Sequence, residues 1–238
     1  MILSLDTSSQ AGSVAVARDS QLLGVVSTTT GEAYSSRIFR QIDFLLSELQ
    51  LTLASFDVFA VNAGPGSFTG LRVGLTAAKA WSEAFARPIA AVNGLEAYAV
   101  QVAGAMGRVI PAIDARRGQV YAARYRPDEG SPSAQLIRES GDEDSVMSPV
   151  EFSDWLAAMG DLHDASLATT SSEWLASIIT KNELAALGLR ICEVSPVLAP
   201  PMARLAFAKA QRGEFVDALK LDANYVRRSD AELNWKEN

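Results

Sequence analysis

Short apolar runs and longer periodic segments alternate along the N-terminal part of the chain. The apolar runs at 2–5, 13–17 and 22–27 are separated by polar turns, so they predict three strands in an antiparallel meander. The next segment carries apolar residues at positions i, i+4, i+7, i+8 and i+11: Ile38, Ile42, Leu45, Leu46 and Leu49. This spacing predicts a helix with one apolar face.

Strand and helix patterns then alternate. A buried strand is predicted at 56–61, a helix at 71–86, a strand at 88–92 and a second helix at 95–103. This alternation is typical of parallel crossover connections. The fold class is therefore predicted to be α/β, with a mixed sheet and flanking helices in a first domain at 1–104.

The beginning of the first half is repeated later in the chain. A strand at 108–113 ends in Asp114 and leads through a glycine-containing turn to a strand at 119–125. The same order of strand, aspartate, turn, glycine and strand surrounds Asp6. This order indicates an internal duplication, although two ordinary hairpins would give the same pattern. A second, related α/β domain is predicted at 105–238.

The second domain is predicted to alternate as well. The expected elements are an exposed acidic excursion at 127–148, a helix from Ser148 to about Met159, a strand at 165–169, a helix at 171–187, a strand at 190–194 and a helix at about 200–212. Ser148 is a strong helix start, because a proline and then a glutamate follow it in the first turn. The last helix can pack back on the first domain.

Composition narrows the class of protein. With 21 Lys and Arg against 28 Asp and Glu, the formal net charge is −7, so unaided binding to a nucleic-acid backbone is not expected. The single cysteine, Cys192, excludes a disulfide within the chain and is expected to be a buried thiol. No segment approaches the roughly 18 apolar residues of a membrane span. We expect a cytoplasmic protein without membrane contact.

The motif GPGSFTG at 64–70 lies where a phosphate-binding loop would be expected. It lacks the lysine of a Walker A loop, it is one residue too long for a dinucleotide fingerprint, and it lacks the glycines that flank a nucleophilic serine. A rigid turn capped by Ser67 or Thr69 is the main interpretation. Weak anion binding at the start of the following helix is the alternative.

Metal and acid–base chemistry have few candidates. The only histidine, His163, excludes a histidine-rich metal site within this chain and would have to serve any catalytic triad. Asp6 and Asp114 end strands at corresponding positions, which leaves a carboxylate-only magnesium site open. The alternative is that each aspartate accepts hydrogen bonds from backbone donors in its own turn. No tightly bound metal is predicted.

Four segments together resemble the TsaB (YeaZ) family over essentially the whole chain. They are ILSLDT at 2–7, GPGSFTGLRVG at 64–74, IDARRGQVY at 113–121 and YVRRSDAE at 225–232. The resemblance implies a glycoprotease-like protein with the actin-like ATPase (ribonuclease H-like) fold, which consists of two related domains. It also implies a role in forming N6-threonylcarbamoyladenosine on the tRNA adenosine beside the anticodon.

In that family the subunit is a non-catalytic scaffold for the paralogue TsaD, together with the ATPase TsaE. The resemblance places the surface that pairs with TsaD, or with a second copy, on the helices at about 33–49 and 70–85. The residues predicted for it are Ile38, Ile42, Leu45, Leu71, Gly74, Leu75, Ala78 and Trp81. No catalytic residue is predicted. ATP and magnesium are expected to be used by the complex, and tRNA is expected to be reached through it.

Two other functions stay open at this stage. One is an ATP-dependent phosphotransferase of the same fold, and the residues predicted for an anion or nucleotide contact are Asp6, Thr7, Ser67, Thr69 and Asp114. The other is a peptidase that uses Ser67 or Thr69, although no general base is in sequence reach. The family often has His-Ser where this chain has Tyr34-Ser35, so a role for that histidine does not carry over. Arg227 and Arg228 form a basic pair that could contact tRNA or partner acids.

Overall fold

The computed structural model describes residues 1–29, 34–102, 107–128 and 136–226. The chain divides into two compact units, one formed by Met1–Gly94 with Val197–Asn238 and the other by Leu95–Pro196. These units differ from the domains expected at 1–104 and 105–238, because the chain returns to the first sheet after the second unit.

The first unit is built on a five-stranded mixed sheet. Its strands are β1 (Ile2–Asp6), β2 (Ser13–Arg18), β3 (Gln21–Ser27), β4 (Val58–Gly64) and β5 (Ile89–Asn93). Their order in the sheet is β3-β2-β1-β4-β5. Strands β1, β2 and β3 pair antiparallel, whereas β1, β4 and β5 are parallel. The predicted meander and parallel crossovers are both confirmed.

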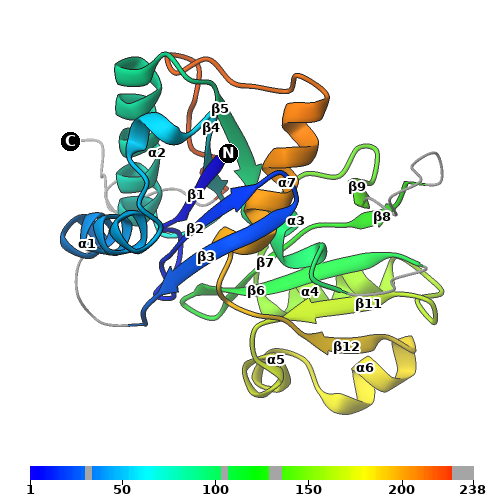
Figure 1. Cartoon of the computed structure of the whole chain (residues 1–238). Coiled ribbons are helices and arrows are strands. Elements are labelled where there is room, and N and C mark those ends of the chain that lie inside the picture. The colour runs from blue at the N-terminus through cyan, green and yellow to red at the C-terminus, as the bar shows by residue number, and fades with distance from the viewer. Residues whose placement is uncertain (30–33, 103–106, 129–135, 227–238) are drawn as a thin grey trace, which may run out of the picture. The chain divides into compact units, whose positions relative to one another are not determined.

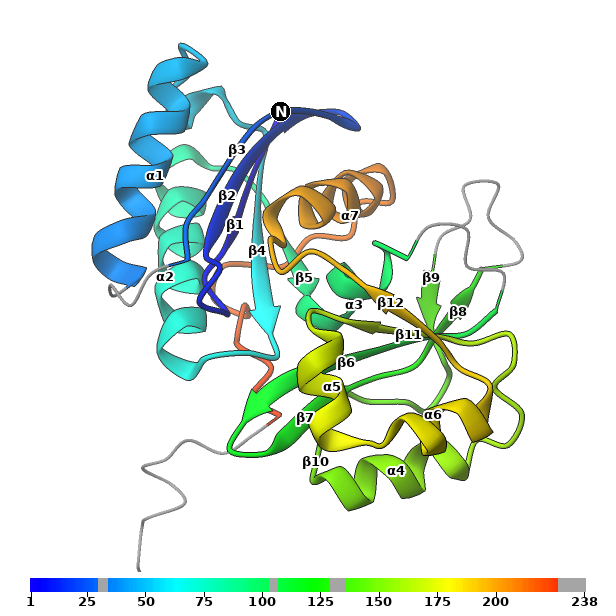
Figure 2. The ribbon, with the colours of Figure 1, turned by 90° about the horizontal axis from the view of Figure 1, so that it is seen from below.

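Helices cover both faces of this sheet (Figures 1 and 2). On one face lie α1 (Tyr34–Glu48) and α2 (Phe68–Phe85), with the short 3-10 turn η1 (Leu53–Ser55) between them in sequence. On the other face lies α7 (Ala199–Gln211), which contacts β1, β2, β4 and β5. The C-terminal helix therefore belongs to the first unit.

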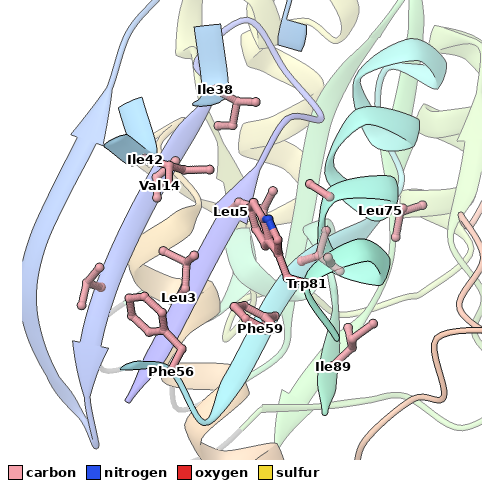
Figure 3. Close-up of a cluster of buried hydrophobic side chains, with 14 of the residues drawn as sticks. Leu3, Leu5, Val14, Ile38, Ile42, Phe56, Phe59, Leu75, Trp81 and Ile89 are labelled. Atoms are coloured by element: carbon pink, nitrogen blue, oxygen red, sulfur yellow. The ribbon is translucent and has the colours of Figure 1, made fainter. Parts of the chain in front are cut away.

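The main core of the first unit lies between its sheet and the pair α1 and α2 (Figure 3). Leu3 and Leu5 point to this side of β1, whereas Ile2 points to the side of α7. The ring of Trp81 packs on Phe59, with 5.5 Å between ring centroids. The alternation along β1 explains how an almost wholly apolar strand can serve two cores, because successive side chains point to opposite faces.

The second unit has a sheet with the same strand order. Its main strands are β6 (Val109–Arg116), β7 (Gln119–Ala122), β10 (Ser145–Met147), β11 (Ser166–Thr169) and β12 (Arg190–Glu193). The order β10-β7-β6-β11-β12 matches that of the first sheet, and again three strands pair antiparallel while three are parallel. The repeated topology agrees with the internal duplication that the sequence indicates.

Short helices connect these strands. They are α3 (Gly94–Ala99), α4 (Pro149–Ala157), α5 (Ser172–Ile178) and α6 (Lys181–Leu187). Ser148 caps α4 as expected, since its hydroxyl accepts a hydrogen bond from the Glu151 N–H. The single helix expected at 171–187 is wrong. Thr180 is extended and starts a new helix with its own capping box, in which Glu183 bonds back to Thr180.

Within the segment expected to be an exposed acidic excursion, the described residues 127–128 and 136–148 are structured. The segment contributes β9 (Leu136–Arg138), which pairs with β8 (Tyr125–Pro127), and the edge strand β10. Two of its acids are not solvated, because the Asp142 side chain is 5% exposed and the Asp144 side chain 1% exposed, whereas Glu143 between them is exposed. Both aspartates accept hydrogen bonds from arginines of this unit, so charge pairing replaces hydration.

The cysteine and the lengths of the helices can also be compared with the expectations. Cys192 is only partly buried, because it lies on β12 at the edge of its sheet. Within the described residues, no helix is both long and apolar enough to cross a membrane.

Candidate functional site

The glycine-rich motif connects β4 to α2. Its Gly64–Pro65 bond is cis, and the Ser67 hydroxyl accepts a hydrogen bond from the Gly70 N–H at 3.3 Å. Ser67 is therefore the N-cap of α2, which begins at Phe68. The structural interpretation of the motif as a capped turn holds, with α2 starting three residues earlier than the sequence pattern predicted.

The loop that follows β1 fills the space beside this motif. A Cβ atom on Gly66 would lie 2.5 Å from the Cβ of Ser8, a distance that real Cβ atoms do not adopt. The Ser67 N–H donates to the Ser8 carbonyl at 2.8 Å, and the Thr7 hydroxyl donates to the Gly70 carbonyl at 2.7 Å. The two loops therefore form one tightly packed unit, and Gly66 is required for their close approach.

A buried polar network lies beneath the two loops. The Asn62 side-chain amide donates to Asp6 Oδ1 and to Ser8 Oγ, both at 2.9 Å, and Asn62 Oδ1 accepts from the Gly64 N–H at 2.8 Å. The Ser8 N–H also donates to Asp6 Oδ1, at 3.0 Å. Sequence reasoning missed Asn62. The signal was a polar residue immediately after the apolar run of a buried strand.

Asp6 is fully buried, and burial raises the pKa of its carboxyl above the usual value, against the lowering effect of its hydrogen bonds to Ser8 and Asn62. Its second oxygen, Oδ2, has no hydrogen-bond partner among the described residues. A raised pKa makes a carboxyl a weaker magnesium ligand, because magnesium binds the ionised form. The described residues also contain no cluster of three metal-ligating side chains.

We expect Asp6→Asn to raise the stability of the protein at neutral pH. The raised pKa means that the unfolded chain ionises Asp6 from about pH 4 upward while the folded chain resists it. The contribution of Asp6 to stability is therefore full below the unfolded pKa and is lost as the pH rises towards the folded pKa. Asparagine keeps the Oδ1 acceptor without this cost. Urea unfolding from pH 4 to 8 should show a difference that grows with pH.

The matched control is Asp114→Asn. Asp114 Oδ1 accepts the Arg116 N–H at 2.7 Å, which is the turn hydrogen bond that Asp6 makes with Ser8, but the Asp114 side chain is 31% exposed. Asp114→Asn should change the free energy of unfolding less than Asp6→Asn does. A loss of stability in Asp6→Asn at pH 7, or a change that does not vary with pH, would contradict the interpretation of Asp6 as a buried carboxyl with a raised pKa.

Most of the other residues predicted for an anion contact take part in local packing or hydrogen bonds. The N–H groups of Ser67 and Gly70 already donate within the two loops, and Thr7 is buried beside Gly74, whose Cβ would lie 2.6 Å from the Thr7 hydroxyl. Thr69 is exposed on the first turn of α2. Asp114 belongs to the second unit and serves its own turn.

The residues predicted for the partner surface need a correction. All eight are buried in the core of the first unit or against its sheet: Ile38, Ile42, Leu45, Leu71, Gly74, Leu75, Ala78 and Trp81. Helical periodicity selected the apolar faces of α1 and α2, and those faces pack on the unit's own sheet. Any partner surface on these helices must use their outer faces.

The outer face of α1 carries two large aromatic side chains. Phe39 is 48% exposed and Phe44 is 59% exposed. On α2 the exposed positions are Thr69, Arg72, Thr76, Ala80, Glu83 and Ala84. Exposed aromatic residues next to a helix of small and polar residues are typical of protein–protein contact surfaces. Their exposure could have been predicted from the sequence, because Phe39 and Phe44 do not belong to the i, i+4, i+7 apolar stripe that begins at Ile38.

Other residues singled out from the sequence lie elsewhere. His163 is exposed, and its ring lies against the backbone of Gly188. Tyr34 is the first residue of α1. Arg227 and Arg228 fall outside the described residues.

Comparison with known proteins gives a consistent relationship. The family model "TsaD: tRNA N6-adenosine threonylcarbamoyltransferase" matches residues 12–143, more than half of the chain. The chain is 28% identical over 237 residues to the tRNA threonylcarbamoyladenosine biosynthesis protein TsaB of Bacillus subtilis, covering 100% of this chain and 98% of that protein. It is 34% identical over 130 residues to TsaB of Escherichia coli K12, covering 54% of this chain and 56% of that protein.

Solved structures agree with the sequence relatives. A protein with similarity to peptidase YeaZ from Pseudomonas aeruginosa superposes with a TM-score of 0.72 at 28% identity, over 95% of this chain and 99% of that one. YeaZ from Pseudomonas aeruginosa gives 0.72 at 27% identity, over 94% and 98%. The expected fold class is confirmed. The chain belongs to the family that the TsaD model describes and, within it, to the TsaB (YeaZ) group of tRNA threonylcarbamoyladenosine biosynthesis proteins.

Proposed function

We propose that this chain is a non-catalytic subunit that binds and stabilises a TsaD-like paralogue, with a TsaE-like ATPase as a further partner, for the formation of threonylcarbamoyladenosine on tRNA. The observation that carries the proposal is the filled glycine loop. Ser8 occupies the space beside Gly66, and the N–H groups of Ser67 and Gly70 are already used. A loop in this state has few donors left for phosphate oxygens.

The groups that the described residues place around the loop support the same conclusion. Asp6 is buried with a raised pKa, and its hydrogen-bond partners are Ser8 and Asn62 rather than a nucleophile. Ser67 uses its hydroxyl as a helix cap, and among the described residues it has no hydrogen bond to a general base of the kind that a peptidase requires. ATP and magnesium then serve the complex rather than this chain.

Partner binding is assigned to the outer faces of α1 and α2. They lie on the same face of the sheet, and α1 exposes Phe39 and Phe44. The same exposed surface is proposed to pair with a second copy when the partner is absent. We expect other subunits of the complex to contact the tRNA, because a chain with a net charge of −7 repels a phosphate backbone.

Calorimetry with Mg-ATP separates this proposal from the phosphotransferase alternative. The isolated chain should give no binding heat up to millimolar nucleotide, because the loop beside Gly66 is filled. Tight binding that is lost in Asp6→Ala would contradict the proposal and support an ATP-dependent enzyme.

Reconstitution tests the role itself. Threonylcarbamoyladenosine formation on tRNA by the TsaD-like and TsaE-like subunits should depend on this chain, and the chain alone should form none. Full modification without it would remove the proposed role.

A further inference from the structure

The segment after α7 returns to the glycine-rich motif of the first unit. The Val216 N–H donates to the Ile89 carbonyl at the edge of the sheet at 2.9 Å, and Leu221 is 2% exposed in the core. The Asn224 N–H donates to the Ala63 carbonyl at 2.6 Å. In Figure 2 this red segment passes β5 and reaches the end of β4. Residues far apart in sequence are therefore held beside the start of α2.

The fit between this segment and the motif is close. A Cβ atom on Gly64 would lie 2.7 Å from the Asn224 carbonyl oxygen, and Gly64 has a φ of +117°, which side-chain-bearing residues rarely adopt. The first glycine of the motif thus has a specific role. It allows the C-terminal segment to lie directly on the turn.

Tyr225 then contacts the first turn of α2. Its ring lies 4.8 Å from the ring of Phe68 between centroids, and its hydroxyl accepts a hydrogen bond from Arg72 Nε at 3.1 Å. The guanidinium carbon of Arg72 lies 3.9 Å from the centroid of Phe68. We call Phe68, Arg72 and Tyr225 the arginine clamp. One hydrogen bond and one aromatic face fix the orientation of the guanidinium.

The charge of the clamped arginine is not neutralised within the described residues. Arg72 is exposed, and none of the described carboxylates forms an ion pair with it, whereas Arg108, Arg124 and Arg138 all pair with acids. Its Nε donates to Tyr225, and the two terminal nitrogens have no hydrogen bond to any of the described residues. A guanidinium held in this way loses little conformational entropy when it binds a carboxylate.

We propose that the arginine clamp is the charged anchor of the protein-binding surface and that it takes a carboxylate side chain of the partner subunit. This inference rests on the proposed function. A protein carboxylate is favoured over an RNA phosphate for two reasons. The neighbouring helix α1 exposes Phe39 and Phe44 on the same face of the sheet, and the chain as a whole is acidic. Arginine and aromatic residues together are typical of interface hot spots.

The role of Tyr225 is positioning. It touches Arg72 and Phe68 but would not itself need to contact the partner's acid. The C-terminal segment thereby becomes part of the binding surface, because its docking through Asn224 brings Tyr225 to Arg72.

The test measures the affinity of the full chain for the TsaD-like subunit of the same organism by calorimetry or interferometry. Arg72→Ala should weaken binding at least tenfold, and Arg72→Lys should restore only part of the loss, because lysine lacks the planar fork. The matched control is Arg204→Ala, an exposed arginine on α7 at the other face of the sheet. It should change affinity less than twofold.

A double-mutant cycle shows whether Tyr225 acts by positioning Arg72 or only by stabilising the fold. Tyr225→Phe should weaken binding several-fold, but in the Arg72→Ala background it should have no further effect. The wild-type affinity should fall more steeply with salt than that of Arg72→Ala. Equal losses from Tyr225→Phe in both backgrounds would contradict the clamp.

The outcomes distinguish this inference from the proposed function. If the wild-type chain does not bind the TsaD-like subunit at all, the proposed function fails. If the wild type binds and Arg72→Ala binds equally well, only the clamp fails. If Arg72→Ala leaves the protein complex intact but weakens tRNA binding to it, the anchor is for phosphate and the inference is overturned.

Discussion

Replacing Phe39 and Phe44 together with glutamate is expected to weaken binding to the TsaD-like subunit by at least about 30-fold, which corresponds to about 2 kcal/mol. The two rings are 48% and 59% exposed on the outer face of α1, so glutamate is tolerated by the free chain. In a complex, the same positions would bury unpaired carboxylates in an apolar contact. Titration calorimetry of the variant against the partner measures the loss.

The control for this pair is Phe215→Glu. Phe215 is 40% exposed but lies beyond α7, outside α1 and α2. It should leave affinity unchanged. The midpoints of thermal unfolding of all variants should stay close to the wild-type value. Wild-type affinity in the double variant would place the partner surface elsewhere.

Asp144→Ala is expected to destabilise the second unit by about 3 kcal/mol. The Asp144 side chain is 1% exposed and forms a charge-assisted hydrogen bond with Arg138, which also donates to the buried hydroxyl of Tyr125 at 2.8 Å. Burial raises the pKa of Tyr125, so this phenol stays neutral and cannot take over the role of the carboxylate. Without Asp144, Arg138 would be left as a partly buried charge with a weaker partner.

Urea unfolding with tryptophan fluorescence provides the measurement, because Trp155 and Trp174 belong to the second unit. The matched control is Glu214→Ala, which removes an ion pair with Arg212 whose two side chains are 48% and 44% exposed. Exposed pairs contribute less than about 1 kcal/mol. An equal effect of the two substitutions would show that burial does not set the strength of the Asp144 pair.

Periodicity and turn chemistry were sufficient to predict most of the fold. The apolar alternation of the first three strands, the helical spacing from Ile38 onward and the Ser148 cap all rest on local physics that tertiary contacts reinforce. The repeated strand, aspartate and turn pattern at Asp6 and Asp114 also has a local cause. Each carboxylate accepts a hydrogen bond from the backbone N–H two residues later.

The candidate surface could not be predicted in the same way. An apolar stripe such as Ile38, Ile42 and Leu45 marks the face that a helix buries, but sequence does not say whether it is buried by the chain's own sheet or by a partner. In this protein the apolar face of α1 packs on the sheet of the first unit. The contact of Tyr225 with Arg72 joins positions 153 residues apart, and no local sequence pattern predicts it.

One of the errors had a signal within the sequence. Thr180 and Glu183 form a capping box inside the segment predicted as one helix, so a break there was readable. The other error had no such signal. The acids near Asp144 suggested a solvated loop by composition, but Asp144 pairs with Arg138 on β9 of the same segment, and Asp142 pairs with Arg124 just before β8.

The most direct test of the central claim is the mass of the species formed when the purified chain is mixed with the TsaD-like subunit. Size-exclusion chromatography with light scattering should give one complex that contains both proteins for the wild type. The variant carrying Phe39→Glu and Phe44→Glu should give two separate species. Separate species with the wild-type chain, under conditions in which both proteins are folded, would contradict the account.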